Sequence, residues 1–472
     1  MAIPQFHFPT STIFIFFFFF LATSRSSDSN LPFQPFDVSS SLQLTRQIFQ
    51  PHLVETPNAV NYSLDAAFSV SASSFSLPLH SRSSLPLPNP YRNNYTALTL
   101  SRLAADKARA DAIVAGQELL QSPVTSGVRQ GSGEYFARVG LGQPPKEFYM
   151  VIDTGSDITW LQCQPCTACY HQSDPVFNPS ESSTYRRLTC GSSTCAALHV
   201  RGCGTDGTCV YEVDYGDGSR TLGDLATETV SFGSTGSVPN VAVGCGHDNE
   251  GLFAGSAGLL GMGAGALSLP SQIGATSFSY CLVKRDSSAA STLDFNTAPP
   301  SDAVVAPLLT NSYAATYRYV AITGIHVGGR PVQIPESLFG ISADGRGGVI
   351  VDSGTAVTRL RSEVYAAFRD TFKSMSRNLP PSDGFSLFDT CYDLSSMSTV
   401  SVPTVGLQFA GGKSLALPPE NYLIPVSSDG KFCLAFAATE GSLSIIGNVQ
   451  QQGTRVSYNL ANKYVSFSPH KC

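Results

Sequence analysis

Apolar and polar residues alternate along most of the chain after residue 130, which is the pattern of short β-strands with one buried face. The first such run places Tyr135, Ala137, Val139 and Leu141 on the same face. Gly (41 residues) and Pro (30 residues) interrupt the runs at short intervals, so turns separate the strands. The pattern therefore predicts an all-β body.

One long segment before this body predicts a helix. Residues 98–121 are rich in Ala, contain no Pro before the break at residues 121–127, and carry two charge pairs at i,i+4 spacing, Arg102/Asp106 and Lys107/Asp111. Residues 28–97 are rich in Ser, Pro and Leu, and we expect them to be loosely structured. Within the body, residues 363–373 predict a short helix that packs an apolar stripe on the core, formed by Val364, Tyr365, Phe368 and Phe372.

The N-terminus begins with an apolar run at residues 13–21, followed by small residues at 22–24. This order predicts a signal peptide over residues 1–26 and entry into the secretory pathway. The run is too short to span a bilayer, and no later segment has the roughly 18 consecutive apolar residues of a membrane helix, so we expect no membrane anchor. Secretion to the extracellular space is favoured; the endoplasmic reticulum, the vacuole and a plastid are the alternatives.

Length and charge bound the remaining classes of function. A chain of 472 residues that is 42% hydrophobic can build two domains with extra segments. Only 14% of residues are charged and the net charge is −6, which speaks against a nucleic-acid partner. Residues 1–130 hold 8 basic and 7 acidic residues, which leaves 21 (29 − 8) against 28 (35 − 7) for the body. The acidic excess therefore lies in the body.

All twelve cysteines lie at or after Cys163. An even number behind a signal peptide predicts six disulfides formed in an oxidising compartment. The spacing of Cys163, Cys166 and Cys169 resembles half of a zinc site, but no Cys or His pair follows at finger spacing. The eight His residues form no spaced metal motif either, so the sequence predicts neither a metal nor a cofactor.

One acidic turn occurs twice. Apolar residues lead into Asp153-Thr154-Gly155-Ser156, and 199 residues later (352 − 153) they lead into Asp352-Ser353-Gly354-Thr355. Gly allows the tight turn, and the hydroxyl residues can hydrogen-bond the acid or the opposite loop. Two such loops facing each other make a carboxylate pair, which holds one proton between two acids and can act as base and acid together.

The acidic turns belong to a larger repeat. Leu259-Leu260-Gly261 ends 108 residues after Asp153 (261 − 153), and Ile445-Ile446-Gly447 ends 95 residues after Asp352 (447 − 352). Each half therefore contains strands, an acidic loop, more strands, and two apolar residues before a Gly. Two similar β lobes that arose by duplication account for this order.

Tyr215-Gly216-Asp217-Gly218-Ser219 follows an alternating strand and predicts a hairpin turn. With both acidic loops, both apolar-apolar-Gly segments and this turn in the same order, the chain resembles the pepsin-like aspartic proteases, in their plant nepenthesin-type branch. The resemblance covers about residues 131–472. It implies an all-β, bilobal fold with the active site in the cleft between the lobes. It divides the chain into a propeptide (27–130), an N-terminal lobe with a cysteine-rich insert and a flap (131–312), and a C-terminal lobe (313–472).

The resemblance also implies roles for individual residues. Asp153 and Asp352 are the catalytic dyad, and the rest of each turn supports it, through Thr154, Gly155, Ser156, Ser353, Gly354 and Thr355. Tyr215 and Gly216 belong to the flap over the substrate cleft, and the indole of Trp160 pairs with Tyr215. Many relatives have Thr where this chain has Ser353. The hydroxyl is kept and a methyl is lost, so we expect activity with slightly looser packing around Asp352.

Spacing alone cannot choose the disulfide partners. The resemblance implies the pairs Cys163–Cys166, Cys169–Cys245, Cys190–Cys209, Cys195–Cys203, Cys281–Cys472 and Cys391–Cys433. Asn61 and Asn94 stand in glycosylation sequences.

The function that the resemblance implies is that of an aspartic endopeptidase, made as a secretory zymogen and active in acid. We expect peptide or protein substrates and a monomer. The alternative is a catalytically inactive binding or inhibitor protein of the same fold. Residues 106–109 resemble a charged helix of related propeptides. Whether Lys107 or Arg109 pairs with the dyad, or both are only solvated, stays open at this point.

Overall fold

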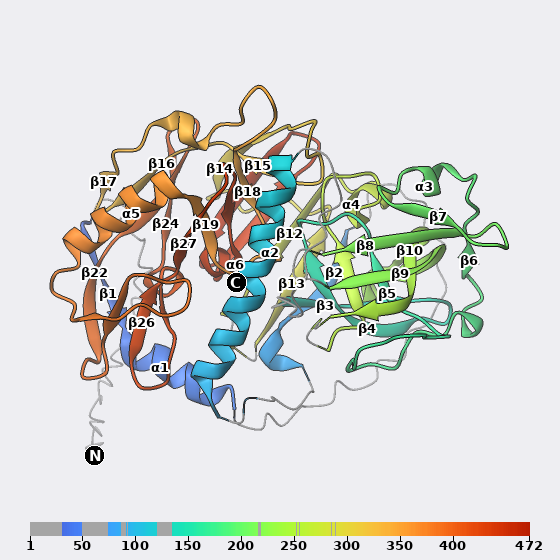
Figure 1. The fold of residues 1–472 in the computed structure, drawn as a ribbon, viewed down its shortest axis with the longest axis horizontal. Helices are drawn as coiled ribbons and strands as arrows, with labels where there is room; N and C mark the ends of the chain where they lie inside the picture. Colours follow the sequence, from blue (N-terminus) through green and yellow to red (C-terminus); the bar gives the residue numbers. More distant parts are fainter. Residues whose placement is uncertain are drawn as a thin grey trace, which may run out of the picture.

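The computed structural model describes residues 31–49, 74–85, 91, 93–119, 135–215, 219–251, 253, 255–284, 286–287 and 289–472. The predicted signal peptide, Asn61 and Gly216 lie outside these residues. The described chain forms two β-rich lobes, with one long helix along the front between them (Figure 1). The all-β, two-lobe prediction is confirmed.

The N-terminal lobe consists of strands joined mainly by tight turns. Its strands are β3 (Tyr135–Leu141), β4 (Lys146–Asp153), β5 (Trp160–Gln162), β6 (Arg186–Arg187), β7 (Arg201–Cys203), β8 (Cys209–Asp214), β9 (Arg220–Ser231), β10 (Ser237–Glu250) and β11 (Gly258–Gly261). The antiparallel pair β9–β10 extends over nearly the whole length of both strands. Short helices α3 (Ser193–Ala196) and α4 (Leu269–Gln272) and the turns η2 (Pro179–Glu181) and η3 (Gly233–Thr235) connect them.

The described part of the C-terminal lobe contains a set of central strands and two four-stranded sheets. Its central strands are β15 (Tyr319–Val320), β18 (Val349–Val351), β19 (Thr358–Arg361), β27 (Phe436–Thr439) and β28 (Ser444–Ile446). One four-stranded sheet has the order β17 (Arg330–Pro331), β16 (Ile322–Val327), β23 (Val405–Phe409), β24 (Lys413–Leu417). The other has the order β20 (Pro381–Ser382), β21 (Cys391–Asp393), β26 (Lys431–Leu434), β25 (Leu423–Pro425). The remaining elements are α5 (Ser362–Met375), α6 (Asn448–Gln451), η4 (Glu336–Phe339) and η5 (Pro419–Asn421).

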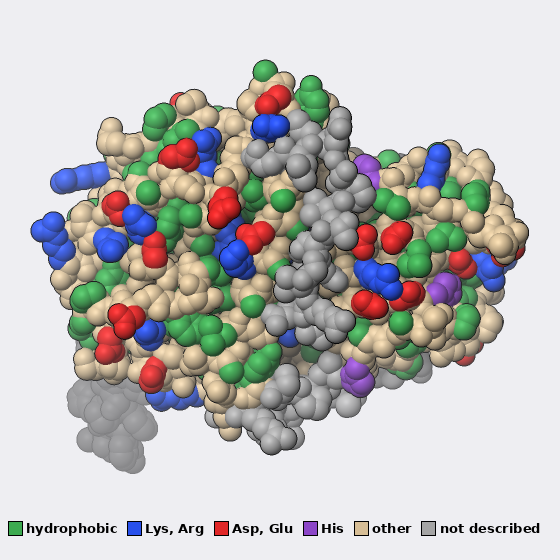
Figure 2. Space-filling model, viewed as in Figure 1, with side chains coloured by type: hydrophobic (Ala, Val, Ile, Leu, Met, Phe, Trp, Pro, Cys, Tyr) green, Lys and Arg blue, Asp and Glu red, His purple; other side chains and the backbone are tan. Residues whose placement is uncertain are grey.

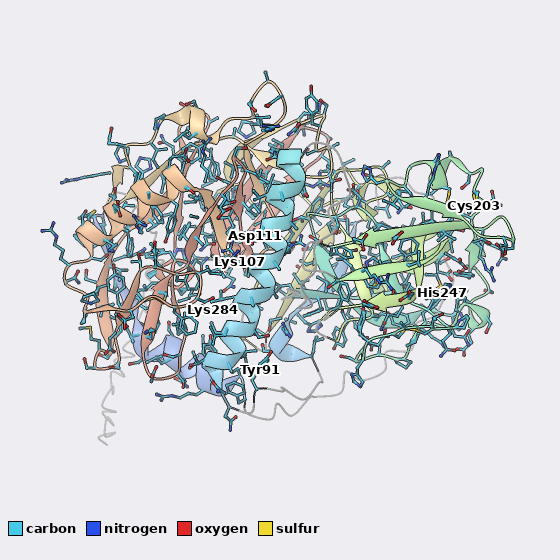
Figure 3. The ribbon with its side chains drawn as sticks, in the orientation of Figure 1. Tyr91, Lys107, Asp111, Cys203, His247 and Lys284 are labelled. Atoms are coloured by element: carbon cyan, nitrogen blue, oxygen red, sulfur yellow. A yellow bond between two sulfur atoms is a disulfide. The ribbon has the colours of Figure 1, made fainter. Side chains whose placement is uncertain are left out.

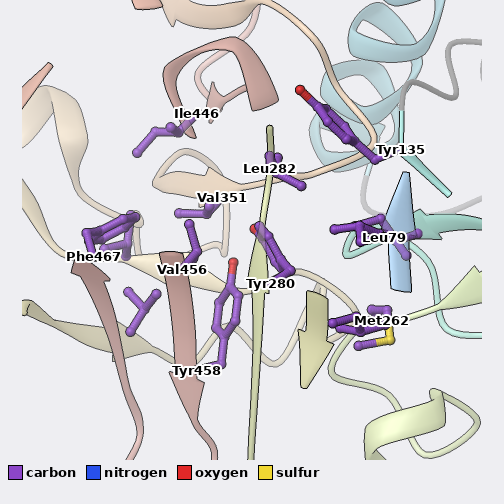
Figure 4. Packing of buried hydrophobic residues seen from close by; sticks show 14 of the residues in the cluster. Leu79, Tyr135, Met262, Tyr280, Leu282, Val351, Ile446, Val456, Tyr458 and Phe467 are labelled. Carbon is purple, nitrogen blue, oxygen red and sulfur yellow. The ribbon is translucent and has the colours of Figure 1, made fainter. Parts of the chain in front are cut away.

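A seven-membered run of paired strands joins the lobes. In spatial order it contains β3, β2 (Phe75–Ser81), β13 (Ala290–Phe295), β12 (Ser277–Cys281), β29 (Thr454–Asn459), β30 (Tyr464–Pro469) and β14 (Val304–Leu309). Strands from both ends of the chain therefore meet in one sheet. Its side chains pack in the main core, where Tyr280 and Tyr458 lie beside each other (Figure 4).

The described part of residues 28–97 is ordered secondary structure, which corrects the expectation of a loose segment. Strand β1 (Phe33–Asp37) pairs with β22 (Thr399–Pro403), and α1 (Val38–Gln47) follows it with Asp37 as N-cap. Strand β2 lies between β3 and β13, and its buried positions alternate along the strand. Its Ser and Pro residues occupy the outward-facing positions or the strand end, so composition concealed an alternating strand.

The helix predicted at residues 98–121 is confirmed as α2 (Tyr95–Leu119), and the one predicted at 363–373 is confirmed as α5. The Lys107/Asp111 pair forms on the outward face of α2 (Figure 3). Arg102 and Asp106 each pair with a residue of the body, Asp286 and Arg359 respectively. The inward side of α2 is therefore charged as well as apolar.

The repeat found in the sequence is a repeat of strand pairing. Strand β4 runs parallel to β11, which aligns Asp153 with Gly261. Strand β18 runs parallel to β28, which aligns Val351 with Ile446. A Cβ at Gly261 would lie 2.2 Å from the Asp157 carbonyl oxygen, and one at Gly447 would lie 2.5 Å from the Ala356 carbonyl oxygen. Only Gly permits the backbones to approach this closely beside each acidic loop.

All twelve cysteines pair, but four of the six expected disulfides are corrected. The structure joins Cys163–Cys245, Cys166–Cys169, Cys190–Cys203, Cys195–Cys209, Cys281–Cys472 and Cys391–Cys433. The last two pairs are the expected ones. The expected pairs Cys163–Cys166, Cys169–Cys245, Cys190–Cys209 and Cys195–Cys203 are not formed.

Burial explains the exchange of partners in the insert. Parallel pairing of β5 with β10 brings Cys163 beside Cys245, and both are fully buried, which leaves the exposed Cys166 and Cys169 for each other. Strands β7 and β8 place Cys203 opposite Cys209. The buried Cys209 joins the buried Cys195, while the exposed Cys203 joins Cys190.

On the face shown in Figure 2, the acidic and basic side chains of the described residues are interspersed. Among the described residues, no helix is both long enough and apolar enough to cross a membrane.

Candidate active site

The two acidic loops meet at the boundary between the lobes. Strand β4 ends at Asp153, and Asp352 follows β18 directly, so matching strands deliver both carboxylates. Each Asp is 1% exposed. A Cβ added at Gly155 would lie 3.0 Å from Asp352 Oδ1, and one added at Gly354 would lie 2.7 Å from Asp153 Oδ1. Gly at both positions therefore lets the loops approach each other.

Each carboxylate accepts one hydrogen bond from the Gly N–H of its own loop and one from the hydroxyl residue that follows this Gly. Asp153 accepts the Gly155 N–H at 2.9 Å and the Ser156 hydroxyl at 2.6 Å. Asp352 accepts the Gly354 N–H at 3.1 Å and the Thr355 hydroxyl at 2.6 Å. These donors favour the ionised form of each acid and fix its orientation.

Two hydroxyl groups tie the loops together. The Ser353 N–H donates to Thr154 Oγ1 at 2.9 Å, and the Thr154 N–H donates to Ser353 Oγ at 3.2 Å. The hydroxyls donate onward to carbonyl oxygens on the opposite lead-in strand: Thr154 to Val351 and Ser353 to Ile152, at 3.3 and 3.2 Å. Ser353 thus makes the contacts of a locking hydroxyl with its side chain 2% exposed.

Tyr215 and Trp160 meet above the Asp153 loop. The Trp160 Nε1–H donates to the Tyr215 hydroxyl oxygen at 2.6 Å, and the indole is fully buried. Phe253 packs edge-on against both rings, and the Tyr215 N–H closes the turn on the Ser219 carbonyl at 2.8 Å. Burial raises the pKa of Tyr215 well above its ordinary value, so its hydroxyl stays protonated.

Arg109 of α2 bridges the two acids. Its Nη2 lies 2.6 Å from Asp153 Oδ1 and 3.0 Å from Asp352 Oδ2, and its Nε lies 3.2 Å from the same Asp352 oxygen. Lys107 points away and is 62% exposed. The structure therefore resolves the open question in favour of Arg109.

The guanidinium changes the protonation of the acid pair. Burial raises the pKa of Asp153 above its ordinary value, against the lowering effect of Arg109. Burial also acts upward on the pKa of Asp352, but Arg109 and the Thr355 hydroxyl hold it below its ordinary value. Although burial disfavours its charge, the two carboxylates raise the pKa of Arg109. Asp352 therefore carries the more stable negative charge of the pair.

Helix α2 contacts the C-terminal lobe along its length. Leu103 packs with Val357 and Phe388, while Ile113 packs with Ile350 and other apolar residues of the same lobe. Near its C-terminal end, the Gln117 amide donates to the Tyr319 hydroxyl at 2.9 Å and to the Gly347 carbonyl at 2.9 Å. With Arg109 on the dyad, the helix also contacts the two acids at the lobe boundary.

Sequence reasoning missed several supports of the loops. Asp157 accepts the Gly265 N–H at 2.8 Å and the Thr316 hydroxyl at 2.7 Å. Gln451 donates to the Asp352 carbonyl at 3.2 Å, and Asn448 donates to the Ser353 carbonyl at 3.0 Å. Asp157 directly follows the first acidic motif, and this position is the only feature of the sequence that points to a role in supporting the loop. Nothing in the sequence marked the other two.

Comparison with known proteins matches both lobes to one family. The family models described as xylanase inhibitor N-terminal and xylanase inhibitor C-terminal match residues 135–295 and 317–469. The chain is 45% identical over 443 residues to the protein ASPARTIC PROTEASE IN GUARD CELL 2 of Arabidopsis thaliana, covering 90% of this chain and 93% of that protein. It is 44% identical over 358 residues to aspartic proteinase nepenthesin-2 of Nepenthes gracilis, covering 74% and 81% of the two chains.

The fold comparison agrees. A crystal structure titled edgp superposes with a TM-score of 0.63 at 20% identity, covering 85% of this chain and 96% of that one, which shows a shared fold. Fold, paired acidic loops and these relatives define a pepsin-like aspartic protease. The chain belongs to that family, in its plant nepenthesin-type branch, and its class is aspartic-type endopeptidase.

Proposed function

We propose that Asp153 and Asp352 hydrolyse peptide bonds with a water molecule held between them. The observation that carries this is the matched hydrogen bonding of two buried carboxylates on facing loops. With Arg109 docked, the pKa of Asp352 lies below its ordinary value and that of Asp153 lies above it. Once Arg109 has left, the two acids share one proton, so that one acts as base and the other as acid.

The proposed reaction needs only these two groups and water. The ionised carboxylate of the dyad takes a proton from the water as the water oxygen attacks the scissile carbonyl carbon, while the protonated carboxyl donates a hydrogen bond to the carbonyl oxygen. The tetrahedral intermediate then collapses, the C–N bond breaks, and the amine leaves with a proton returned from the dyad. The Gly N–H and hydroxyl donors keep both acids oriented through these steps.

Tyr215 and Trp160 are proposed to position the flap over the substrate. The hydrogen bond between them and the ring of Phe253 hold the base of the flap in place. A closed flap excludes water from the reacting carbonyl. Gly216, the next residue of the proposed flap, lies outside the described residues.

We infer that the chain is made as a zymogen, with residues 1–26 as signal peptide, 27–130 as propeptide, and 131–312 and 313–472 as the N- and C-terminal lobes. Helix α2 supports this, because Arg109 occupies the position between the two acids. The propeptide must therefore leave before a substrate can bind.

The remaining parts of the proposal concern the compartment, glycosylation, substrates and oligomeric state of the enzyme. Six disulfides suit a secreted or vacuolar protein working in an oxidising, acidic compartment. Asn94 is exposed at the start of α2, which suits its proposed glycosylation; Asn61 is the second proposed acceptor. We propose peptide or protein substrates and a monomeric enzyme.

A catalytically inactive binding protein is the second candidate, because the matching family models carry the description xylanase inhibitor. Such a protein does not need a complete dyad with its locking hydroxyls. Here every dyad contact described above is present, which favours the enzyme.

The test is expression of the proform, acidification, and assay on a denatured protein. We expect cleavage that pepstatin inhibits and that Asp153→Ala and Asp352→Ala each abolish. A folded, processed protein that cleaves nothing would support the binding protein. Activity retained in both variants would contradict the proposed dyad.

A further inference from the structure

A carboxylate of helix α2 lies in a ready-made anion site beside the Asp352 loop. Asp106 is fully buried. The Ala356 N–H donates a short hydrogen bond to Asp106 Oδ1. The Val357 nitrogen lies 3.3 Å from both oxygens of this carboxylate. Arg359 Nη2 lies 2.6 Å from Asp106 Oδ2. Two backbone donors and a guanidinium thus converge on one carboxylate.

All three donors belong to the C-terminal lobe. Ala356 and Val357 follow the Asp352 motif directly, and Arg359 stands on β19. This strand runs parallel to β27 and pairs with β28 at Arg359. The sheet therefore fixes the donors independently of α2.

The site has more donor capacity than Asp106 uses. The Arg359 side chain is 3% exposed, and its Nη1 has no hydrogen-bond partner among the described residues. Asp106 is its only ion-pair partner in the described part of the chain. If α2 leaves, the Arg359 guanidinium and the two N–H groups lose the anion that they bind in the docked state.

We infer that, in the activated enzyme, the N–H groups of Ala356 and Val357 and the guanidinium of Arg359 bind a side-chain carboxylate of the substrate, from Asp or Glu. This inference rests on the proposed function, because it requires α2 to leave on activation. Asp106 then serves in the proform as a stand-in for that substrate carboxylate.

The position of the site limits where the acidic residue lies in the substrate. Asp106 is three residues from Arg109, which contacts the dyad, so the two side chains start about 4.5 Å apart along the helix axis. One or two residues of extended peptide span that distance. The acidic residue is therefore expected within a few residues of the scissile bond.

The experiment uses the acid-activated wild-type protein and one apolar peptide scaffold amidated at its C-terminus. Asp is placed at each position in turn and compared with Asn at the same position. At one position we expect kcat/KM to be about tenfold or more higher for Asp, mainly through a lower KM, because a charge-assisted hydrogen bond replaces a neutral one. The preference should fade as the pH falls below about 3.9, where the substrate carboxyl protonates.

A matched pair of variants assigns the effect to Arg359. Arg359→Gln should remove the preference for Asp, whereas Arg361→Gln, on the same strand and paired with Glu363, should keep it. A second peptide set with a free C-terminus separates a side-chain carboxylate from a terminal one. A preference found only with free C-termini would overturn the side-chain assignment, as would equal rates for Asp and Asn at every position.

A measurement of inhibition on the wild-type protein tests the same site even if the Arg359→Gln variant does not fold. A synthetic peptide of residues 95–119 should inhibit the wild-type activated protein about tenfold more strongly than the same peptide carrying Asp106→Asn. Equal inhibition would overturn the inference. If the processed protein cleaves no peptide, the proposed function fails, and displacement of a labelled 95–119 peptide by the two unlabelled peptides still reads the carboxylate site.

Discussion

At the scale of single residues, the hydroxyl group of Ser353 makes the contacts that join the second acidic loop to the first. Ser353 donates its hydroxyl to the Ile152 carbonyl and accepts the Thr154 N–H, and the Thr154 hydroxyl makes the equivalent contacts in the other direction. The absent methyl group takes part in none of these hydrogen bonds. The hydroxyl, and not the methyl, therefore defines this position.

Replacing the hydroxyl should cost more than restoring the methyl. Ser353→Ala leaves a buried N–H and a buried carbonyl without their partner, and we expect a loss of about 1–3 kcal/mol in the free energy of unfolding and a lower kcat. Ser353→Thr keeps the hydroxyl and should stay within about 1 kcal/mol of wild type. Urea unfolding of the proform and peptide cleavage by the activated protein measure both. An alanine variant as stable and active as the threonine variant would contradict this role.

Arg109 and Lys107 form a second matched pair of residues. Arg109 contacts both acids, whereas Lys107 pairs only with Asp111 on the exposed side of α2. Arg109→Gln removes the cation from a buried site, which should weaken helix docking by about 3–5 kcal/mol. We expect the uncleaved Arg109→Gln proform to hydrolyse a small fluorogenic peptide, and the Lys107→Gln proform to remain inactive. Equal latency of the two variants would show that Arg109 does not block the dyad.

At the scale of elements, β2 shows that part of the predicted propeptide belongs to the sheet between the lobes. Leu77 and Leu79 are 0% and 1% exposed, and the strand pairs on both edges. Both side chains lie in the same core cluster as side chains of the body. The N-terminal segment therefore contributes to the stability of the proform as well as to its latency.

A core substitution in β2 measures that contribution. Leu79→Ala should destabilise the proform by about 2–5 kcal/mol, because it leaves a cavity among buried side chains. Leu100→Ala on α2 is the control, because Leu100 is 44% exposed and its loss should change stability by less than about 0.5 kcal/mol. The two midpoints of urea unfolding should differ accordingly. Similar midpoints would mean that β2 is only loosely attached.

What the sequence could predict depended on local repetition. The lead-in strands, both Asp loops, α2 and α5 carry their own periodicity or motif, and each was located from it. Strand β2 is not predicted from the sequence, because its Ser and Pro residues are typical of loops and the run of alternating apolar residues is short. The disulfide between Cys163 and Cys245 follows from the pairing of β5 with β10. The spacing of cysteines along the sequence does not reveal this pairing.

The same limit applies inside the site. The sequence placed Arg109 near the dyad only as one of several alternatives, because a helix face cannot be oriented before its partner surface is known. Asp106 was read as one half of an i,i+4 pair with Arg102, and its partner Arg359 is 253 residues away. Long-range ion pairs of this kind have no local signal.

At the scale of the whole molecule, the proform holds a charged helix on the C-terminal lobe and an acid pair at the lobe boundary. Three carboxyl groups change their surroundings when α2 leaves. Arg109 lowers the pKa of both Asp153 and Asp352 while it is docked. Burial raises the pKa of Asp106 in the docked state above the ordinary value, against the lowering effects of Arg359 and of the Ala356 and Val357 N–H groups. Asp352 and Asp106 therefore couple docking to pH with opposite signs.

The lowered pKa of Asp352 in the docked state favours release of α2 in acid. Because Arg109 holds the pKa of Asp352 below its ordinary value, the docked state binds fewer protons at Asp352, and the stability that this contact contributes is lost as the pH falls through the docked pKa of Asp352, below 3.8. Asp106 contributes the reverse, because its raised pKa makes the docked state bind a proton more tightly. Arg109→Gln should therefore remove the dependence of α2 release on acid, whereas Asp106→Asn should leave acid release in place.

Hydrogen exchange in α2 during the first seconds after a pH jump measures this before any cleavage. Exchange in α5, which stays packed on the C-terminal lobe, corrects for the intrinsic effect of pH on amide exchange. We expect wild-type α2 to lose protection relative to α5 as the pH falls, and the Arg109→Gln helix to show low protection with little dependence on pH. Protection of wild-type α2 that is constant with pH, or that falls as the pH rises, would show that the contact between Arg109 and the two acids does not govern release.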